Sequence, residues 1–195
     1  MAEAELPNPR ELEEIREKKF HSVIALITAV YAVVLAIASL GGNHAMKEML
    51  LAQQQSSDQW AHYQAKSIRE HLYMSQKMML ENELALLSGT VGGDRAAKAD
   101  AAIKKLGSEA DRFAGEKRQI MKEAKALEKK RDKNESKHPY FEYAEVLLQI
   151  AIIMASVSII ADSTAVFALS LLFSLLGAFM CANGYLQFVV MPFIH

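Results

Sequence analysis

The sequence predicts an all-α integral membrane protein with three transmembrane helices and a long antiparallel helical hairpin, a coiled coil, outside the bilayer. Two blocks, Ser22–His44 and Val146–Ile194, carry almost no charge and are long enough to supply three apolar spans. The region between them is charged and helical in pattern, and a glycine-rich turn divides it into two arms of similar length.

The charge of the chain is unevenly distributed. Of the 195 residues, 51% are hydrophobic and 23% charged, and all 22 Lys and Arg residues lie at or before Lys137. The middle region is only mildly basic and its basic residues are interleaved with acidic ones, so we expect no nucleic-acid partner. The single cysteine, Cys181, excludes a disulfide framework within one chain.

The expected organisation has five parts in chain order. They are an N-terminal tail with a short charged helix (1–19), a first transmembrane helix (20–41), an extramembrane helical hairpin (42–138, with its turn at 88–94), a second transmembrane helix (139–161) and a third (164–190).

The first span rests on its length and on the absence of a polar face. Phe20–Leu40 supplies about the ~20 apolar residues that a helix needs to cross the hydrocarbon core. Its polar residues Ser22, Thr28 and Ser39 form no continuous stripe, as a soluble helix of this length would require. We expect the span to end at Gly41–Gly42.

The hairpin rests on helical patterning on both sides of the turn Ser-Gly-Thr-Val-Gly-Gly-Asp. The first arm, Asn43–Leu87, lacks Gly and Pro, and its apolar stripe drifts, so part of its face is available to another protomer. Asp94 is expected to cap the returning arm. That arm has a coiled-coil seam in which only Lys117 is charged; its apolar members are Ala99, Ile103, Leu106, Ala110, Phe113, Ile120, Ala124 and Leu127.

The last two spans follow a predicted break at His138–Pro139. An aromatic cluster there, Tyr140, Phe141 and Tyr143, is typical of the headgroup level of a membrane. A tight turn at Asp162–Ser163 joins the spans, and we expect Asp162 to cap the third helix rather than to bind a proton or ion.

Small residues recur with four-three spacing in all three spans, which predicts close helix packing and favours a homo-oligomer. The predicted membrane packing residues are Ala25, Ala29, Ala32 and Ala36 in the first span, Ala151, Ala155 and Ser158 in the second, and Ser170, Ser174, Gly177, Cys181 and Gly184 in the third. Asn183 and Gln187 need polar partners, which a neighbouring helix or a water-filled pore would supply.

The charges that flank the spans give two opposing indications of topology. Arg10, Arg16, Lys18 and Lys19 precede the first span, which favours a cytoplasmic N-terminus and a hairpin on the external, periplasmic side. The basic residues 129–137 before the second span favour the reverse, and the turn at Asp162 has neither Lys nor Arg. Because the first helix usually dominates, the external hairpin is our expectation.

No pattern for catalysis or cofactor binding emerges. His62 and His71 lie nine residues apart and face different sides of one helix, so we expect no metal site. The glycine-rich turn lacks the Lys-Ser/Thr of a phosphate-binding loop. We therefore expect no enzyme activity and no cofactor.

The order of features resembles a family of bacterial inner-membrane proteins catalogued as domain of unknown function 4337. The likeness rests on Gly41-Gly42-Asn43, on Leu50–Tyr73 (LLAQQQSSDQWAHYQAKSIREHLY) and on Ala144–Ile153 (AEVLLQIAII). The resemblance implies a three-span bacterial membrane protein and brings no activity, cofactor or catalytic residue.

These observations favour a non-enzymatic, membrane-anchored scaffold or assembly protein that self-associates through its helices, with the hairpin as a surface for self-association or for a protein partner. The expected contact residues are Trp60, Tyr63, Ile68 and Leu72, because large apolar side chains dominate interface energies. An equal alternative is that they pack against Phe113 and Leu106 within the hairpin. The alternative function is a subunit of an oligomeric channel or transporter.

Overall fold

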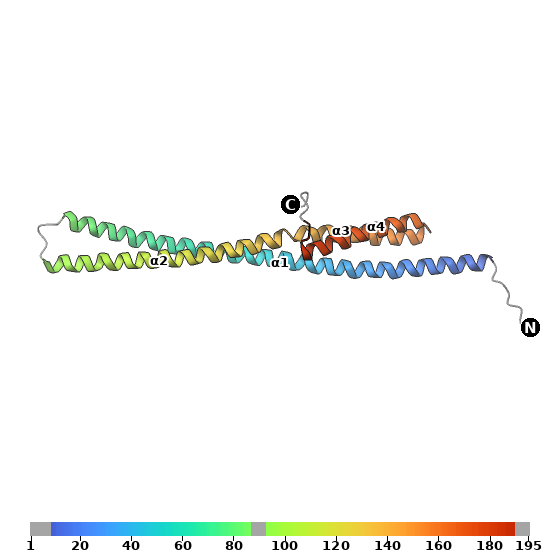
Figure 1. Ribbon diagram of the computed structural model, residues 1–195, viewed down its shortest axis with the longest axis horizontal. Helices are drawn as coiled ribbons and strands as arrows, with labels where there is room; N and C mark the ends of the chain where they lie inside the picture. The colour runs from blue at the N-terminus through green and yellow to red at the C-terminus, as the bar shows by residue number, and fades with distance from the viewer. Residues whose placement is uncertain (1–8, 87–92, 190–195) are drawn as a thin grey trace, which may run out of the picture. The chain divides into compact units, whose positions relative to one another are not determined.

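The structure is a computed structural model that describes residues 9–86 and 93–189, with side chains from residue 13. It contains four helices, α1 (Pro9–Leu86), α2 (Gly93–Glu135), α3 (His138–Ile160) and α4 (Thr164–Leu186), and no strand within those ranges (Figure 1). The all-α prediction is therefore confirmed. Most of the predicted N-terminal tail, and residues 88–92 of the predicted turn, lie outside the described residues.

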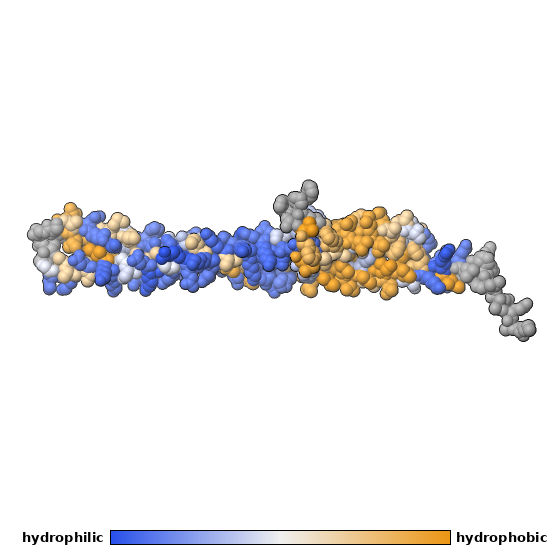
Figure 2. All heavy atoms as spheres, viewed as in Figure 1, coloured by the Kyte–Doolittle hydropathy of each residue, from blue (hydrophilic) through white to orange (hydrophobic). Residues whose placement is uncertain are grey.

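Three helical segments are long and apolar enough, by length and composition, to cross a membrane. They are Glu13–Leu86, Gly93–Ile160, which includes both α2 and α3, and Thr164–Leu186. Figure 2 shows the apolar side chains gathered over α3, α4 and the first part of α1. The chain divides into two compact units, one made of Met1–Glu48 with Lys133–His195 and the other of Met49–Asp132.

The first unit packs α1, α3 and α4 around two small clusters of buried side chains. One cluster contains Ile24 and Tyr31 of α1 with Ala151 and Ala155 of α3. The other contains Ala38, Ala45, Phe141, Ala144, Leu148 and Cys181. Alanine predominates in both, and its small side chain lets the helix backbones approach closely, which is how apolar helices gain packing energy in lipid.

Glycines provide the closest of these approaches. A Cβ atom added at Gly41 would lie 2.5 Å from Cε1 of Phe141, and one added at Gly184 would lie 2.8 Å from the same atom. The ring of Phe141 also stacks edge-on against Tyr185, with a centroid distance of 4.9 Å. Glycines on α1 and α4 thus make the space that this aromatic ring of α3 fills.

This packing accounts for the two glycines at which the first span is expected to end. Gly41 and Gly42 do not interrupt the helix, because α1 continues unbroken from Pro9 to Leu86. Each glycine costs about 1 kcal/mol of helix propensity relative to alanine, but both are buried where Phe141 leaves no room for a Cβ of normal contact distance. Their role is close packing.

The second unit pairs the later part of α1 with α2. Contacts join Trp60 to Glu128, Lys66 to Glu116 and Tyr73 to Phe113, so residue numbers rise along α1 as they fall along α2. Every apolar member of the predicted α2 seam is buried or half-buried; Ala110, Phe113, Ile120 and Ala124 are the fully buried ones. α2 begins at Gly93, so Asp94 lies in the first turn and is not the residue that precedes it.

We predict opposite effects for alanine at two glycines. A Cβ at Gly177 would lie 2.8 Å from Cγ of Leu148 and 3.2 Å from the carbonyl oxygen of Ala144, so Gly177→Ala should destabilise the fold by about 1–3 kcal/mol. A Cβ at Gly115 of α2 would meet nothing within 4 Å. Gly115→Ala should therefore stabilise the helix by about 0.5–1 kcal/mol. Unfolding of the detergent-solubilised protein by increasing SDS, followed by circular dichroism, measures both; equal effects of the two variants would contradict this packing.

Candidate functional site

The expected contact residues divide between two faces of α1. Trp60 and Tyr63 are half-buried on the face toward α2. The indole N–H of Trp60 donates a hydrogen bond to Oε1 of Glu128 at 2.8 Å. The rings of Trp60 and Tyr63 meet edge-on, with 5.4 Å between their centroids. The Lys117 ammonium lies 5.6 Å from the centroid of the Tyr63 ring. These two aromatics therefore bind α2 of the same chain.

Ile68 and Leu72 lie on the other face and are 69% and 54% exposed. They belong to a set that we call the α1 stripe, whose members follow four-three spacing, are all exposed and carry no charge: Ala61, Ala65, Ile68, Leu72, Ser75, Met79, Asn82 and Leu86. At 3.6 residues per turn the stripe lies on the side of α1 opposite Tyr63 and Glu70, which face α2. The unit thus leaves a second apolar face of α1 uncovered within the chain.

Pairs of oppositely charged side chains join the two helices. Lys66 of α1 lies 2.5 Å from Glu116 of α2, and Lys117 of α2, the charged position of the seam, pairs with Glu70 of α1. Lys66 also lies 5.2 Å from the centroid of the Phe113 ring. Sequence reasoning missed these pairs; a test of opposite charges at reversed register between the arms would have found them.

The ion pair of Glu116 is reflected in its titration. The hydrogen bond from Lys66, together with the charges of Lys66, Arg112 and His62, holds the pKa of Glu116 below its ordinary value of 4.5, although desolvation partly opposes this shift. The carboxylate is therefore ionised throughout the neutral range, and its pairing with Lys66 fails only in acid.

The small-residue stripes of the spans take two different positions. Those of α3 and α4 are buried where these helices meet, and the Ser170 hydroxyl donates a hydrogen bond to the carbonyl oxygen of Ala151 at 2.9 Å. The stripe of α1, made of Ala25, Ala29, Ala32 and Ala36, is exposed. The residues that α1 packs within the chain are instead Ile24, Tyr31 and Ala38.

Asp162 has a different partner from the one expected. The residue that precedes α4 is Ser163, and its side chain makes no capping hydrogen bond, so the expectation that Asp162 caps this helix is wrong. The Oδ1 atom of Asp162 lies 2.8 Å from Nε2 of His21 on α1. Asp162 adopts a positive φ of 42°, a conformation that aspartate tolerates better than most residues. The turn therefore ties α3 and α4 to the start of the apolar part of α1.

The polar residues near the end of α4 find partners within the chain. Asn183 is 1% exposed; its amide donates to the carbonyl oxygen of Val189 at 2.8 Å, and its Oδ1 accepts from the Val189 N–H at 2.9 Å. The Gln187 amide donates to the Ser136 hydroxyl at 3.3 Å. The hydrogen-bonding needs of these side chains thus require neither a second copy nor a pore.

Within residues 9–86 and 93–189, no cluster of three or more His, Cys, Asp or Glu side chains has the arrangement of a metal site. The described polar groups instead serve helix contacts: cross-helix ion pairs in the second unit and short hydrogen bonds between small residues in the first.

Fold and site together define an all-helical protein with three segments apolar and long enough to span a membrane. A family model described as "Domain of unknown function (DUF4337)" matches residues 20–187, and the chain belongs to this family, in agreement with the resemblance seen in the sequence. Neither the curated proteins nor the solved structures contain a match to the chain.

The lowered pKa of Glu116 predicts an acid-dependent contact between α1 and α2. A carboxylate whose pKa is lowered by folding stabilises the folded state above its unfolded pKa, and the contribution disappears as the pH falls through the lower, folded value. Near neutral pH, Glu116→Gln should therefore increase amide hydrogen exchange around residues 60–73 and 113–128. The difference from the unsubstituted protein should diminish below pH 4.5.

Glu83→Gln is the matched control, because Glu83 is exposed and no ion pair is recorded for it among the described residues. Amide exchange rates of both variants are measured by mass spectrometry over a pH series and corrected for intrinsic exchange. A Glu116→Gln effect that is unchanged between pH 7 and pH 3 would show that the ion pair does not carry it.

Proposed function

We propose that this chain is a non-enzymatic, membrane-anchored assembly protein of the bacterial inner membrane. In this proposal the apolar parts of α1, α3 and α4 cross the bilayer. The later part of α1 and α2 form an antiparallel hairpin on the periplasmic side, and the hairpin binds a second copy of the chain. The support comes from the exposed apolar surface of the first unit, from the cross-helix contacts of the second, and from the α1 stripe.

The case for membrane spanning rests on what the first unit leaves exposed. Large aliphatic side chains stand outward on all three helices, among them Leu26 and Leu40 of α1 (both 70% exposed), Ile153 and Ile160 of α3 (62% and 85%) and Leu175 of α4 (61%). Contiguous apolar surface of this extent is rare on water-soluble monomers. Such a surface is stable in contact with lipid, because a helix in the hydrocarbon core forms all its backbone hydrogen bonds internally.

The case for a hairpin in water rests on the charges of the second unit. Its seam is apolar except for Lys117, which pairs with Glu70; Lys66 pairs with Glu116 across the two helices; and its outer surface is rich in ionisable groups. Such a surface is costly to transfer to hydrocarbon and well solvated in water.

The observation that carries self-association is the α1 stripe. Eight uncharged positions recur over residues 61–86 on a helix whose opposite face is already occupied by α2. Two copies anchored in one membrane present this stripe in parallel. In such a parallel pair, residues beside the stripe on one copy face residues beside it on the other. The facing pairs are Gln64 with Arg69, His71 with Gln76, and Met78 with Glu83, so no two like charges face each other. A second copy is therefore an electrostatically compatible partner.

Two carboxylates placed in the stripe should break this association. Each buried aliphatic side chain contributes about 1.5–3 kcal/mol, so Ile68→Glu with Leu72→Glu should weaken self-association by at least about tenfold. Light scattering of the protein in mild detergent should show a defined multimer for the unsubstituted chain and a smaller species for the double variant.

The matched control places the same two carboxylates on α2, as Ala101→Glu with Ala126→Glu, both at exposed positions away from the stripe. This control should keep the multimer, and circular dichroism should show the same helix content in all three proteins. A monomeric unsubstituted chain, or a multimer that survives Ile68→Glu with Leu72→Glu, would refute self-association through the stripe.

A further inference from the structure

A cavity of about 340 Å³ opens in the first unit where its three apolar helical stretches end. α1 contributes Leu40 and His44 at the end of its uncharged stretch, the junction of α2 and α3 contributes Asn134 and Lys137, and α4 contributes Tyr185 in its last turn. In a spanning protein this level is the boundary between hydrocarbon and headgroups, and the aromatic side chains Phe141 and Tyr185 beside the cavity are typical of it.

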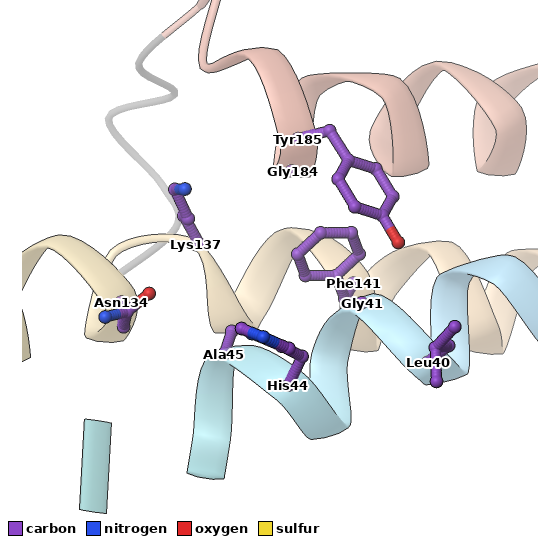
Figure 3. Close-up of a pocket in the computed structure, with 9 residues that line it drawn as sticks. All are labelled: Leu40, Gly41, His44, Ala45, Asn134, Lys137, Phe141, Gly184 and Tyr185. Carbon is purple, nitrogen blue, oxygen red and sulfur yellow. The ribbon is translucent and has the colours of Figure 1, made fainter. Parts of the chain in front are cut away.

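The wall of the cavity has two chemical characters. Leu40, Ala45 and Phe141 form an apolar side, and His44, Asn134, Lys137 and Tyr185 form a polar side, on which the Tyr185 hydroxyl already donates to the carbonyl oxygen of Ile37; none of the nine lining residues is acidic (Figure 3). Figure 3 shows that these polar side chains come from separate parts of the chain, His44 from α1, Tyr185 from α4, and Asn134 and Lys137 from either side of the α2–α3 break.

Lys137 supplies the charge of the site. Its backbone is fixed at the start of α3, where its N–H donates to Asn134 and its carbonyl accepts from Tyr140. Its ammonium makes no ion pair with any carboxylate among the described residues, whereas the neighbouring His138 lies 3.5 Å from Glu142. A half-buried ammonium beside a cavity without a carboxylate favours an anionic ligand.

We propose that this cavity binds the headgroup of an anionic phospholipid, with Lys137 and His44 on the phosphate and the acyl chains against the exposed apolar surface below. This rests on the proposed function, since it requires the first unit to span a bilayer. Such a ligand matches both sides of the cavity wall. A phosphate oxygen accepts charge-assisted hydrogen bonds from an ammonium, and the apolar side contacts the glycerol and the first methylene groups of the acyl chains. Basic pockets between spanning helices are known to bind anionic lipid headgroups.

The experiment measures lipid adducts on the full-length protein by native mass spectrometry. The delipidated protein in mild detergent is titrated with phosphatidylglycerol, with phosphatidylcholine of the same acyl chains, and with inorganic phosphate. Phosphatidylglycerol should bind in preference to phosphatidylcholine. A Lys near an anionic headgroup is worth about 1 kcal/mol, so Lys137→Gln should lower phosphatidylglycerol binding about fivefold, and Lys137→Arg should retain it.

Lys133→Gln is the matched control, since Lys133 is exposed in the last turn of α2, one turn before Lys137, and does not line the cavity. It should leave the preference unchanged. Equal binding of the two lipids, or equal losses in the Lys133 and Lys137 variants, would overturn the site. Inorganic phosphate that binds as tightly as phosphatidylglycerol would overturn the assignment to a lipid.

Failure of this site is separable from failure of the membrane anchor. Each variant is also expressed in cells and its membranes are washed with alkaline carbonate, which removes proteins that do not span the bilayer. A protein that stays in the membrane but shows no lipid preference refutes the headgroup site alone. A protein that carbonate releases refutes the anchor and the site together.

Discussion

Close contact between helix backbones is the constraint on which the first unit depends. In the bilayer that we propose for this unit, helices gain little hydrophobic energy from meeting each other, so van der Waals packing and short hydrogen bonds have to hold them together. Gly41, Gly184 and Gly177 leave no room for a Cβ of normal contact distance, and Phe141 and Leu148 fill the space. The same proximity lets the Ser170 hydroxyl reach the carbonyl oxygen of Ala151, which satisfies a buried polar group.

The second unit is held together by the burial of apolar side chains and by ion pairs between its two helices, as in a water-soluble coiled coil. Its seam removes Phe113 and Ile120 from solvent; Lys117, the charged position of that seam, pairs with Glu70, and Lys66 pairs with Glu116. These half-buried pairs place opposite charges at facing positions, which selects one register over its neighbours. The apolar α1 stripe has no such partner in the chain, which is why we assign it to a second copy.

Much of the fold was predictable because its signals are local. The α2 seam follows from four-three spacing, and the break between α2 and α3 follows from Pro139. The sequence does not show that Trp60 and Tyr63 face α2 while Ile68 and Leu72 are exposed. The apolar stripe of the first arm drifts around the helix, so it does not indicate which of these residues face inward.

What sequence reasoning missed depends on partners distant in the chain. The role of Gly41 and Gly42 in packing is not visible in the sequence, since nothing in their own neighbourhood points to Phe141. Asp162 was assigned to a local cap, but its partner His21 lies 141 residues away. The face that α1 packs inward contains Ile24, Tyr31 and Ala38, and spacing alone did not distinguish it from the exposed alanine stripe. The cavity at Lys137 is lined by residues of α1, α3 and α4 and by the end of α2, so it exists once these helices are in place.

The most direct test of the account asks whether lipid covers the exposed aliphatic faces of the first unit. Single cysteines at Leu26, Ile153 and Leu175, in a Cys181→Ser background, are treated with a water-soluble maleimide in opened membrane vesicles, and Arg118→Cys on the exposed surface of α2 is the reference. The account predicts that Arg118→Cys reacts at once and the other three only after denaturation in detergent. Labelling of the three positions as fast as that of the reference would contradict membrane spanning.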